Sequence, residues 1–467
     1  MASAGFPIYV AAGRHGWVCE KPEGSVLVLG PPRSGKTACI MIPNVLAAYG
    51  PVVSTSTKQD VFFATVSARR SLGTCWSFDP SGSMPSFEGT VPLRWSPADA
   101  CSEWDDAVAM ADLMVRTARM QSRGDDMSFW NERANTLLAP LLHAAAISGA
   151  GMRAVLDSIQ RRDPGDALAI LESAGAERAV AALSDVEGAH ERERSGNYST
   201  LSAVLGAYRL SGALENATDA NFDPTSFVDG ADTIYICSPS HRQAVVAPIV
   251  VGLIKVVQRA TIARFAAHEL SSWTGGLEGG ALEGGALQGG GGKAGGLGQV
   301  ERRPPVLMAL DELANIVPLW DLDSMVADGG SQGLSILACL QDMSQARARW
   351  GTAAEGFFTV FGTKVLLAGI GDQRTLQLVS ALSGDADARV RSVTRAAPQA
   401  LGWASLRPRR TSITSSTRRQ PVLPVDEVAR GRPGMALVIA QMAKPEWAQL
   451  TPWYSSEPWR TIAAGGS

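Results

Sequence analysis

One eight-residue segment, Gly30 to Thr37, fits the phosphate-binding loop pattern G-x-x-x-x-G-K-[ST] in full. An apolar run at 25–29 precedes it and another at 38–42 follows it, which supplies the strand and the helix that such a loop requires. In this type of loop, backbone N–H groups surround the phosphates, the lysine neutralises charge and the hydroxyl group holds Mg²⁺. We therefore predict a nucleotide site made by Gly30, Pro31, Pro32, Arg33, Ser34, Gly35, Lys36 and Thr37.

The composition is that of a globular protein with a sizeable core, because 45% of the residues are hydrophobic and 19% are charged. A chain of 467 residues predicts about two or three folding units. The net charge of −3 argues against a nucleic-acid-binding surface over the whole molecule, so any such contact has to be local. The six cysteines form no C-x-x-C pair and are typical of buried residues in a reducing compartment. The five histidines lack metal-ligand spacing, so we expect no metal other than magnesium.

Short β-branched runs bounded by turns or helices predict buried, mainly parallel strands. They lie at 26–29, 52–55, 74–78, 233–237, 306–310, 335–340, 364–368 and 435–440. Helical patterns between many of them predict an α/β fold with a central sheet. The strand series breaks between about 97 and 223, where 104–117, 128–148 and 165–183 have helical periodicity. We therefore expect a nucleotide-binding domain in two segments, 1–97 and 227–467, with an all-α domain at 98–226 inserted between them.

Residues 274–298 form a glycine-rich segment of low complexity. Such glycine density cannot bury enough apolar surface to offset the entropy lost on ordering. The composition favours a flexible surface insertion without a catalytic role.

The run 306–310 ends in the acid pair Asp311 and Glu312, as a Walker B segment does. Asp311 would hold Mg²⁺ through water, and Glu312 would polarise the attacking water. Acids at strand ends are common, so the pair is informative chiefly in combination with the phosphate-binding loop. Together the two motifs predict an enzyme that hydrolyses ATP. The run 335–340 ends in Gln341, which is either a catalytic sensor of the γ-phosphate or a polar residue that only caps the strand.

Further motifs follow in a fixed order along the chain. They are Ile42-Pro-Asn-Val-Leu46, Phe78-Asp-Pro80, Leu93-Arg-Trp-Ser-Pro97, the helical segment from Phe129, Asp311-Glu-Leu-Ala-Asn-Ile316 and Leu340-Gln-Asp-Met-Ser-Gln345. Over nearly the whole chain this series resembles the type IV secretion coupling proteins, the TraG/TraD-type ATPases of conjugation.

The resemblance implies a RecA-like P-loop NTPase motor domain with an inserted all-α domain, and ATP and Mg²⁺ as cofactors. It further implies a ring, expected to be a hexamer, that docks on type IV secretion channel components at the cytoplasmic face of the bacterial inner membrane. Such a ring drives single-stranded DNA, with attached relaxase or other secreted proteins, across the envelope. The all-α domain would face the cytoplasm and recruit the substrate.

The sequence departs from the family pattern at three places. The family's "DPKGE" element reads Ser56-Thr-Lys58-Gln-Asp60, which leaves the roles of Lys58 and Asp60 open. Its "GRSRG" turn is Gly329-Gly-Ser-Gln-Gly333, without either arginine. An arginine finger acting on the neighbouring subunit would then come from Arg374, Arg349 or Arg347.

The third departure concerns the membrane, since family members usually begin with two membrane-spanning helices. The apolar stretch 134–152 contains Pro140 and His143, and the stretch 244–257 is short and contains Lys255, so neither predicts a membrane span. We therefore expect either a native anchor ahead of Met1 or a membrane-bound partner.

Basic residues cluster at 389–395 and 407–419 among serines and threonines. This segment could contact phosphates near the ring. A solvated loop is the interpretation that we favour, because charge runs usually are solvated and Trp403 alone offers little for base stacking.

Two other functions remain open. One is an FtsK/HerA-like translocase of double-stranded DNA, which the predicted all-α insertion disfavours. The other is a substrate-recruiting secretion adaptor with weak or no ATPase activity, which the missing turn arginines keep open.

Overall fold

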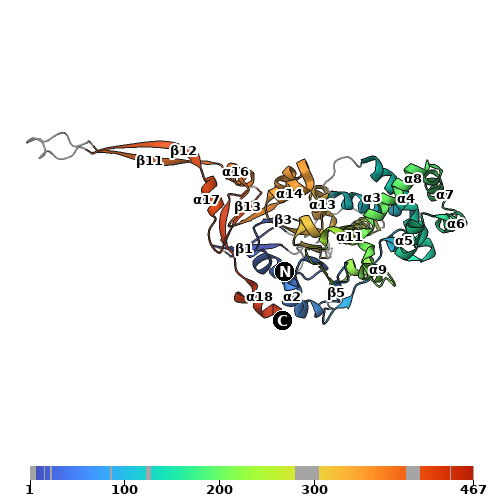
Figure 1. Ribbon diagram of the computed structural model, residues 1–467. Helices are drawn as coiled ribbons and strands as arrows, with labels where there is room; N and C mark the ends of the chain where they lie inside the picture. The colour runs from blue at the N-terminus through green and yellow to red at the C-terminus, as the bar shows by residue number, and fades with distance from the viewer. Residues whose placement is uncertain are drawn as a thin grey trace, which may run out of the picture.

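A 12-stranded sheet forms the centre of the molecule, in the order β2-β1-β14-β13-β10-β3-β9-β8-β4-β7-β5-β6 (Figure 1). The computed structural model describes residues 7–14, 16–21, 24–84, 87–121, 128–278, 304–395, 411–441 and 443–465. The strands of the sheet are β1 (Tyr9–Gly13), β2 (Gly16–Cys19), β3 (Ser25–Leu29), β4 (Val52–Ser56), β5 (Cys75–Phe78), β6 (Val91–Pro92), β7 (Thr233–Cys237), β8 (Val306–Leu310), β9 (Leu334–Leu340), β10 (Thr363–Leu367), β13 (Met435–Ala440) and β14 (Glu446–Gln449).

Neighbouring strands are parallel from β10 across the sheet to β6. Every run that the sequence predicts as a strand is a strand, with each end within one residue of its prediction. The predicted parallel direction is wrong for one strand, because β13 runs antiparallel to β10. From β13 the sheet continues as an antiparallel extension through β14, β1 and β2. The extension and β6 were not predicted, since these strands are short and most lack a continuous β-branched run.

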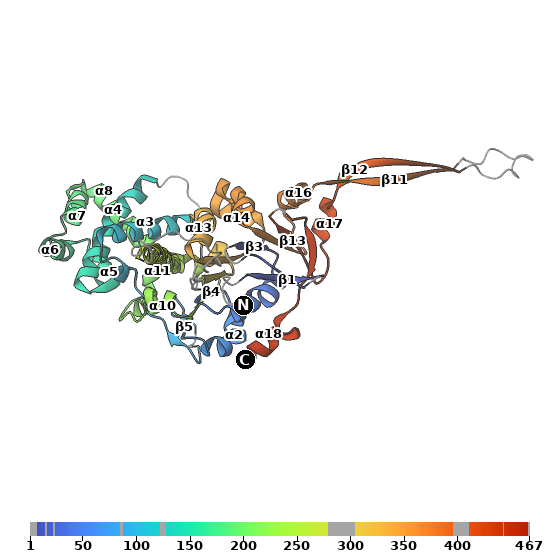
Figure 2. The ribbon, with the colours of Figure 1, turned by 180° about the vertical axis from the view of Figure 1, so that it is seen from behind.

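Helices cover both faces of the sheet and connect its parallel strands (Figure 2). A π-helix at Thr37–Met41 continues directly into α1. The covering helices are α1 (Ile42–Ala47), α2 (Asp60–Arg70), α11 (Gln243–Glu278), α12 (Leu313–Ile316), α13 (Leu322–Gly329), α14 (Met343–Trp350), α15 (Phe357–Val360), α16 (Gln373–Leu382), α17 (Val425–Arg430) and α18 (Trp459–Ala463).

A group of helices between β6 and β7 gathers at one end of the molecule (Figure 1). Between these two strands the described residues contain no further strand. The predicted helix over 165–183 is two helices, because Gly175 adopts a left-handed φ of +68° just after α6 ends. The helices are α3 (Trp104–Gln121), α4 (Ser128–Ser148), α5 (Gly151–Arg161), α6 (Gly165–Ser173), α7 (Glu177–Gly188), α8 (Glu191–Val204), α9 (Ser211–Asn216) and α10 (Pro224–Asp229). The domain limits at 98 and 226 stay a prediction.

Alternate side chains of the central strands enter two hydrophobic cores, one on each face of the sheet. Leu27 and Leu29 belong to the core that includes α3, α4 and α11. Val26 and Val28 belong to the core that includes α1, α2 and Trp459 of α18. Because both faces are covered, the central strands are apolar at nearly every position, which explains the continuous runs in the sequence.

The helix α11 is a core helix that packs against α3 and α10. By length and composition its residues 243–268 could cross a membrane, but 67% of the apolar window is buried within the fold. This burial accounts for its apolar composition. The same helix continues to Glu278, so the start of the glycine-rich segment predicted at 274–298 is helical. The rest of that segment lies outside the described residues.

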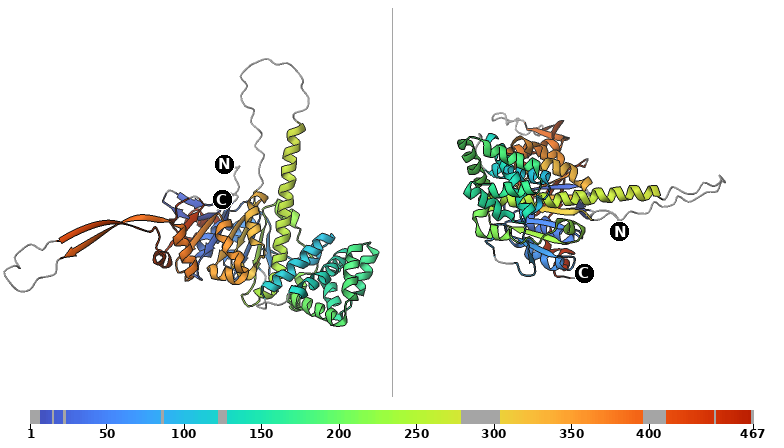
Figure 3. Two further views of the ribbon diagram at one scale, coloured as in Figure 1. Left: turned by 90° about the horizontal axis from the view of Figure 1, so that it is seen from above. Right: turned by 90° about the vertical axis from the view of Figure 1, so that its right-hand side faces the viewer.

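A two-stranded antiparallel ribbon projects from the opposite end of the sheet to α3–α8 (Figure 3). Its strands are β11 (Asp385–Arg395) and β12 (Thr411–Pro421), paired from Asp385↔Pro421 to Arg395↔Thr411. The favoured prediction of a solvated loop is therefore wrong for these residues, because their backbones satisfy each other's hydrogen bonds in a ladder. Trp403 and the basic residues from 407 to 410 lie outside the described residues.

Candidate functional site

The predicted site residues lie at one edge of the sheet, where the parallel strands β10, β3, β9 and β8 end. The phosphate-binding loop follows β3, Gln341 follows β9, and Asp311 with Glu312 follows β8. Crevices outside the carboxyl ends of parallel strands are the usual ligand sites of open α/β sheets. The fold therefore brings together motifs that are far apart in the sequence.

The phosphate-binding loop is tight, and its backbone depends on residues in left-handed conformations. Gly35 has a φ of +97° and Arg33 a φ of +65°, a conformation that non-glycine residues rarely adopt. A Cβ atom on Gly30 would lie 2.6 Å from Ser34 Oγ and 2.9 Å from Leu367 Cβ. Gly30 is thus required for packing the loop against β10, whereas Pro32 and Arg33 are exposed.

Lys36 and Ser34 place polar groups inside this loop. Lys36 is buried, and its ammonium group donates hydrogen bonds to the carbonyl oxygens of Gly30 (2.5 Å) and Pro31 (3.0 Å). Ser34 Oγ is buried and has no hydrogen-bond partner within the described part of the chain. A buried cation beside an unsatisfied hydroxyl group fits an anionic ligand such as a phosphate.

Thr37 and Asp311, the two residues predicted to hold Mg²⁺, contact each other. Thr37 Oγ1 donates a hydrogen bond of 3.1 Å to Asp311 Oδ2. The other carboxylate oxygen accepts from the Glu312 N–H at 3.1 Å, and Thr55 Oγ1 donates to the Asp311 carbonyl at 3.0 Å. Burial raises the pKa of Asp311, and the neighbouring Glu312 raises it further, although Lys36 and Thr37 oppose this shift. A hydroxyl group beside a buried carboxylate offers the hard oxygen donors that Mg²⁺ prefers.

Glu312 has a strained backbone and borders a polar cavity. Its φ of 52° and ψ of 41° are left-handed, and such strain is concentrated at functional sites. Its carboxylate accepts a hydrogen bond of 3.3 Å from Asn315 Nδ2. The adjoining cavity of about 260 Å³ is lined by Thr57, Ser240, Gln243, Ala244, Glu312, Asn315 and Arg349. Arg349 therefore lies beside Glu312 of its own subunit.

The backbone of Gln341 is held by α14, the helix that follows it. Its backbone N–H donates to Gln345 Oε1 at 2.9 Å. Asp342 caps α14 by accepting from the N–H groups of Ser344 and Gln345 at 2.9 and 3.1 Å. Since the side chain of Gln341 is only half-buried, the geometry agrees with either of its two predicted roles.

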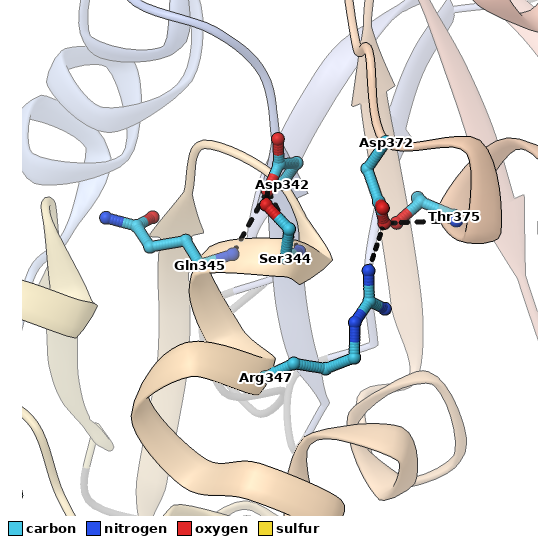
Figure 4. Close-up of polar contacts among 6 residues, drawn as sticks. All are labelled: Asp342, Ser344, Gln345, Arg347, Asp372 and Thr375. Atoms are coloured by element: carbon cyan, nitrogen blue, oxygen red, sulfur yellow. Dashed lines mark hydrogen bonds and ion pairs between the residues drawn. The ribbon is translucent and has the colours of Figure 1, made fainter.

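The three arginines proposed for the neighbouring site differ in environment. Arg347 forms an ion pair of 2.5 Å with Asp372 at the start of α16, and both side chains are largely buried (Figure 4). Arg349 donates to the carbonyl oxygen of Met120 in α3. Arg374 is exposed on α16. Only Arg374 therefore presents an exposed side chain at this edge of the sheet among the three.

Sequence reasoning missed three residues that support the site. Asn315 follows Glu312 by three positions, a spacing that could have indicated contact within one helical turn. Gln345 similarly follows Gln341 by four positions. Asp372 precedes a helix, which is a typical capping position, but its pairing with Arg347 across 25 residues left no signal in the sequence.

Two family models match the chain. The model described as type IV secretory system conjugative DNA transfer matches residues 7–269. The model described as the TraM recognition site of TraD and TraG matches residues 305–433. No curated protein matches the sequence.

Solved structures of a bacterial conjugative coupling protein have a similar fold. The unbound form of TrwBdeltaN70 has a TM-score of 0.64 and 17% identity, covering 91% of this chain and 84% of that chain. TrwB in complex with ADP and Mg²⁺ has a TM-score of 0.62 and 17% identity, covering 92% and 85%. TrwB in complex with the ATP analogue ADPNP has a TM-score of 0.63 and 16% identity, covering 92% and 86%.

The fold likeness confirms a RecA-like P-loop architecture with a large, mostly parallel sheet. The first family model alone covers more than half of the chain. The chain therefore belongs to the family of type IV secretory system conjugative DNA-transfer proteins.

Proposed function

We propose that the protein is an ATP-hydrolysing coupling protein, which moves single-stranded DNA, with or without attached protein, into a type IV secretion channel. The hydrogen bond between Thr37 and Asp311 carries the proposal, because it unites the two motifs that an Mg²⁺-dependent ATPase needs. The ADP and Mg²⁺ bound to TrwB support the same choice of cofactors here.

In this proposal Lys36 leaves the carbonyl oxygens of Gly30 and Pro31 to pair with the nucleotide phosphates. Thr37 and Asp311 hold Mg²⁺, which when bound neutralises charge on the phosphate oxygens. Glu312 accepts the proton of the attacking water, and Asn315 orients its carboxylate. Gln341 would report loss of the γ-phosphate to α14, and the hydrogen bond from its backbone N–H to Gln345 supports this role.

We assign the arginine that acts on a neighbouring subunit to Arg374, because it is exposed. Arg347 is occupied by Asp372, and removing it would leave a largely buried carboxylate without its partner. Arg349 borders the cavity beside Glu312 and contacts α3, so its role lies within its own subunit. A hexameric ring at the cytoplasmic face of the inner membrane, attached through an anchor or a partner, would bring Arg374 to the next nucleotide site.

ATP turnover by the purified protein, measured with and without DNA, tests this proposal. We expect single-stranded DNA to stimulate turnover and Arg374→Ala to abolish the stimulation while leaving nucleotide affinity unchanged. Exposed Arg178 of the helical region provides the matched control, since Arg178→Ala should leave turnover unchanged.

Three results would contradict the proposal in different ways. Stimulation by double-stranded DNA alone would indicate a translocase of the FtsK/HerA kind. No turnover in a sample that sizing shows to be a ring would indicate a recruiting adaptor. Normal stimulation of Arg374→Ala would leave the motor intact but remove Arg374 from it.

A further inference from the structure

The ribbon β11–β12 concentrates positive charge on one face, as its register and sequence show. Consecutive residues of a strand belong to opposite faces, and directly paired residues share a face. Arg389, Arg391 and Arg395 of β11 therefore occupy one face, which we call the arginine face. Arg418 occupies the other face, whereas Arg419, Asp385 and Asp387 share the arginine face at its base. Charge is thus distributed unequally between the two faces of the ribbon.

Hydroxyl-bearing residues occupy the positions opposite the three arginines. The register pairs Arg389 with Thr417, Arg391 with Ser415 and Arg395 with Thr411. Arginine, serine and threonine are among the residue types that donate to phosphate oxygens. The arginine face therefore carries a repeated arginine–hydroxyl pair, interrupted only by the pair Val393↔Ile413.

The acids of the ribbon lie only at its base. Asp385 forms an ion pair of 3.3 Å with Arg419 of β12, and Asp387 is opposite Arg419 in the register. Beyond Asp387 neither strand contains an Asp or a Glu. The outer part of the ribbon is therefore a cationic arm, on a protein whose net charge is −3.

We propose that this arm binds the phosphate backbone of double-stranded nucleic acid without sequence preference. The two strands contain no Phe, Tyr or Trp, the residues on which the bases of a single strand would stack. A two-stranded ribbon fits the major groove of a duplex, which is about 12 Å wide. Each strand of eleven residues spans roughly 35 Å, enough to follow several base pairs.

An anionic membrane surface is the less favoured partner. The register places Ala388, Val390, Ser392 and Thr394 of β11 on the face opposite the arginines, a set with one large apolar residue, whereas membrane insertion needs a broad apolar face. The duplex contact goes beyond the proposed function, because transport of a single strand does not require it.

Duplex binding over a series of salt concentrations tests the proposal with the full chain. Each phosphate contact contributes about 0.9 to the slope of log K against log salt. The triple variant Arg389→Gln, Arg391→Gln, Arg395→Gln should reduce this slope by about 2 to 3 and weaken binding on the order of 10- to 100-fold. The exposed triple Arg153→Gln, Arg178→Gln, Arg192→Gln loses the same charge and should leave the slope unchanged.

Two single variants test which face of the ribbon contacts the duplex. Arg391→Gln should lower the slope by about 0.9, whereas Arg418→Gln on the opposite face should leave it unchanged. Both keep the ribbon sequence otherwise intact, so they remain informative if the triple variant fails to fold. Nucleotide affinity, measured in parallel, reports that the motor core is intact.

An unchanged salt slope in the arginine-face variants overturns the proposal. An equal fall of the slope in the control triple variant at Arg153, Arg178 and Arg192 also overturns it. Loss of binding to vesicles with anionic lipid, with duplex binding retained, would assign the arm to a membrane instead. We expect Lys36→Ala to bind duplex normally, and loss of duplex binding in that variant would also contradict the proposal. This variant separates failure of the arm from failure of the ATPase.

Discussion

Thr37 Oγ1 lies 3.1 Å from Asp311 Oδ2, although 274 residues separate the two in the chain. The contact joins the helix that follows β3 and the phosphate-binding loop to the end of β8, and β9 lies between β3 and β8 in the sheet. Both strands are buried and paired to β9, so the segments that follow them, the phosphate-binding loop and the Asp311–Glu312 pair, start from fixed positions in the sheet. The carboxylate is thus placed by the end of β8, whereas the hydroxyl group is placed by the π-helix that begins at Thr37, directly after the phosphate-binding loop.

Replacing Gly30 by alanine should disable the loop. The added Cβ would approach Ser34 Oγ to 2.6 Å and Leu367 Cβ to 2.9 Å, so the loop has to shift. We expect ATP affinity to fall at least about ten-fold and the free energy of unfolding to fall by about 1–3 kcal/mol. Titration with a fluorescent nucleotide and chemical denaturation measure the two effects. Gly371→Ala is the control, since a Cβ there meets nothing within 4 Å, and an equal effect of both variants would contradict this account.

Asp311→Asn should stabilise the protein while it destroys the proposed magnesium site. The folded-state pKa of Asp311 is raised by burial, so its ionised form is less favourable in the folded than in the unfolded chain. Stability is therefore lost as pH rises through the ordinary pKa towards the raised one, and the asparagine removes this cost. At neutral pH we expect the free energy of unfolding to increase by roughly 0.5–2 kcal/mol.

Thermal unfolding with and without Mg²⁺ and ATP measures this trade-off. Ligand binding to the folded state should raise the midpoint of the original protein but not of Asp311→Asn. A destabilised asparagine variant that still responds to Mg²⁺ and ATP would contradict the assignment.

Asp372 should stabilise the fold in a pH-dependent manner. Burial raises its pKa, but hydrogen bonds from Thr375 and Arg347 outweigh burial and hold the pKa below its usual value. Its contribution is thus present above the ordinary pKa and is lost as pH falls through the lower, folded-state value. We expect Asp372→Asn to cost about 1–2 kcal/mol at neutral pH, with the difference shrinking below about pH 4. Asp426 forms an exposed ion pair with Arg430. The control variant Asp426→Asn should therefore lower the free energy of unfolding by less than about 0.5 kcal/mol.

Cysteine reactivity should follow burial. Cys19 is exposed, whereas Cys39 is buried on the helix after the phosphate-binding loop, where burial raises its pKa to about 11. Burial likewise raises the pKa of Cys237 to about 12. In the native protein we expect Cys19 to react with a thiol reagent at least about ten-fold faster than the buried cysteines. Mass spectrometry after brief labelling identifies the modified residue, and early modification of Cys39 would contradict the described packing.

The parallel strands could be predicted because each is covered on both faces. Val26 and Val28 enter one core and Leu27 and Leu29 the other, so the sequence carries an uninterrupted apolar signal. The antiparallel direction of β13 could not be predicted in this way, since direction depends on the connection and not on the composition of the strand. The short strands β1, β2 and β14 were missed for a different reason, because most of them lack a continuous β-branched run.

The ribbon escaped prediction because its sequence is rich in charged and polar residues. Residues such as Arg418 and Arg419 are exposed, so no alternation of apolar and polar residues marks the strands. At the site, the motifs predicted which residues matter, but not their partners. The contacts of Arg347 with Asp372 and of Arg349 with Met120 join distant segments, and only the fold determines them.

The central claim is that Lys36 and Glu312 serve one ATPase site in different ways. ATP turnover measured beside ATP affinity in Lys36→Ala and Glu312→Gln tests it most directly. We predict that Lys36→Ala loses both, because the ammonium group binds phosphate, whereas Glu312→Gln retains ATP binding and loses turnover by about 10²- to 10⁴-fold. Turnover that persists unchanged in Glu312→Gln would contradict the account.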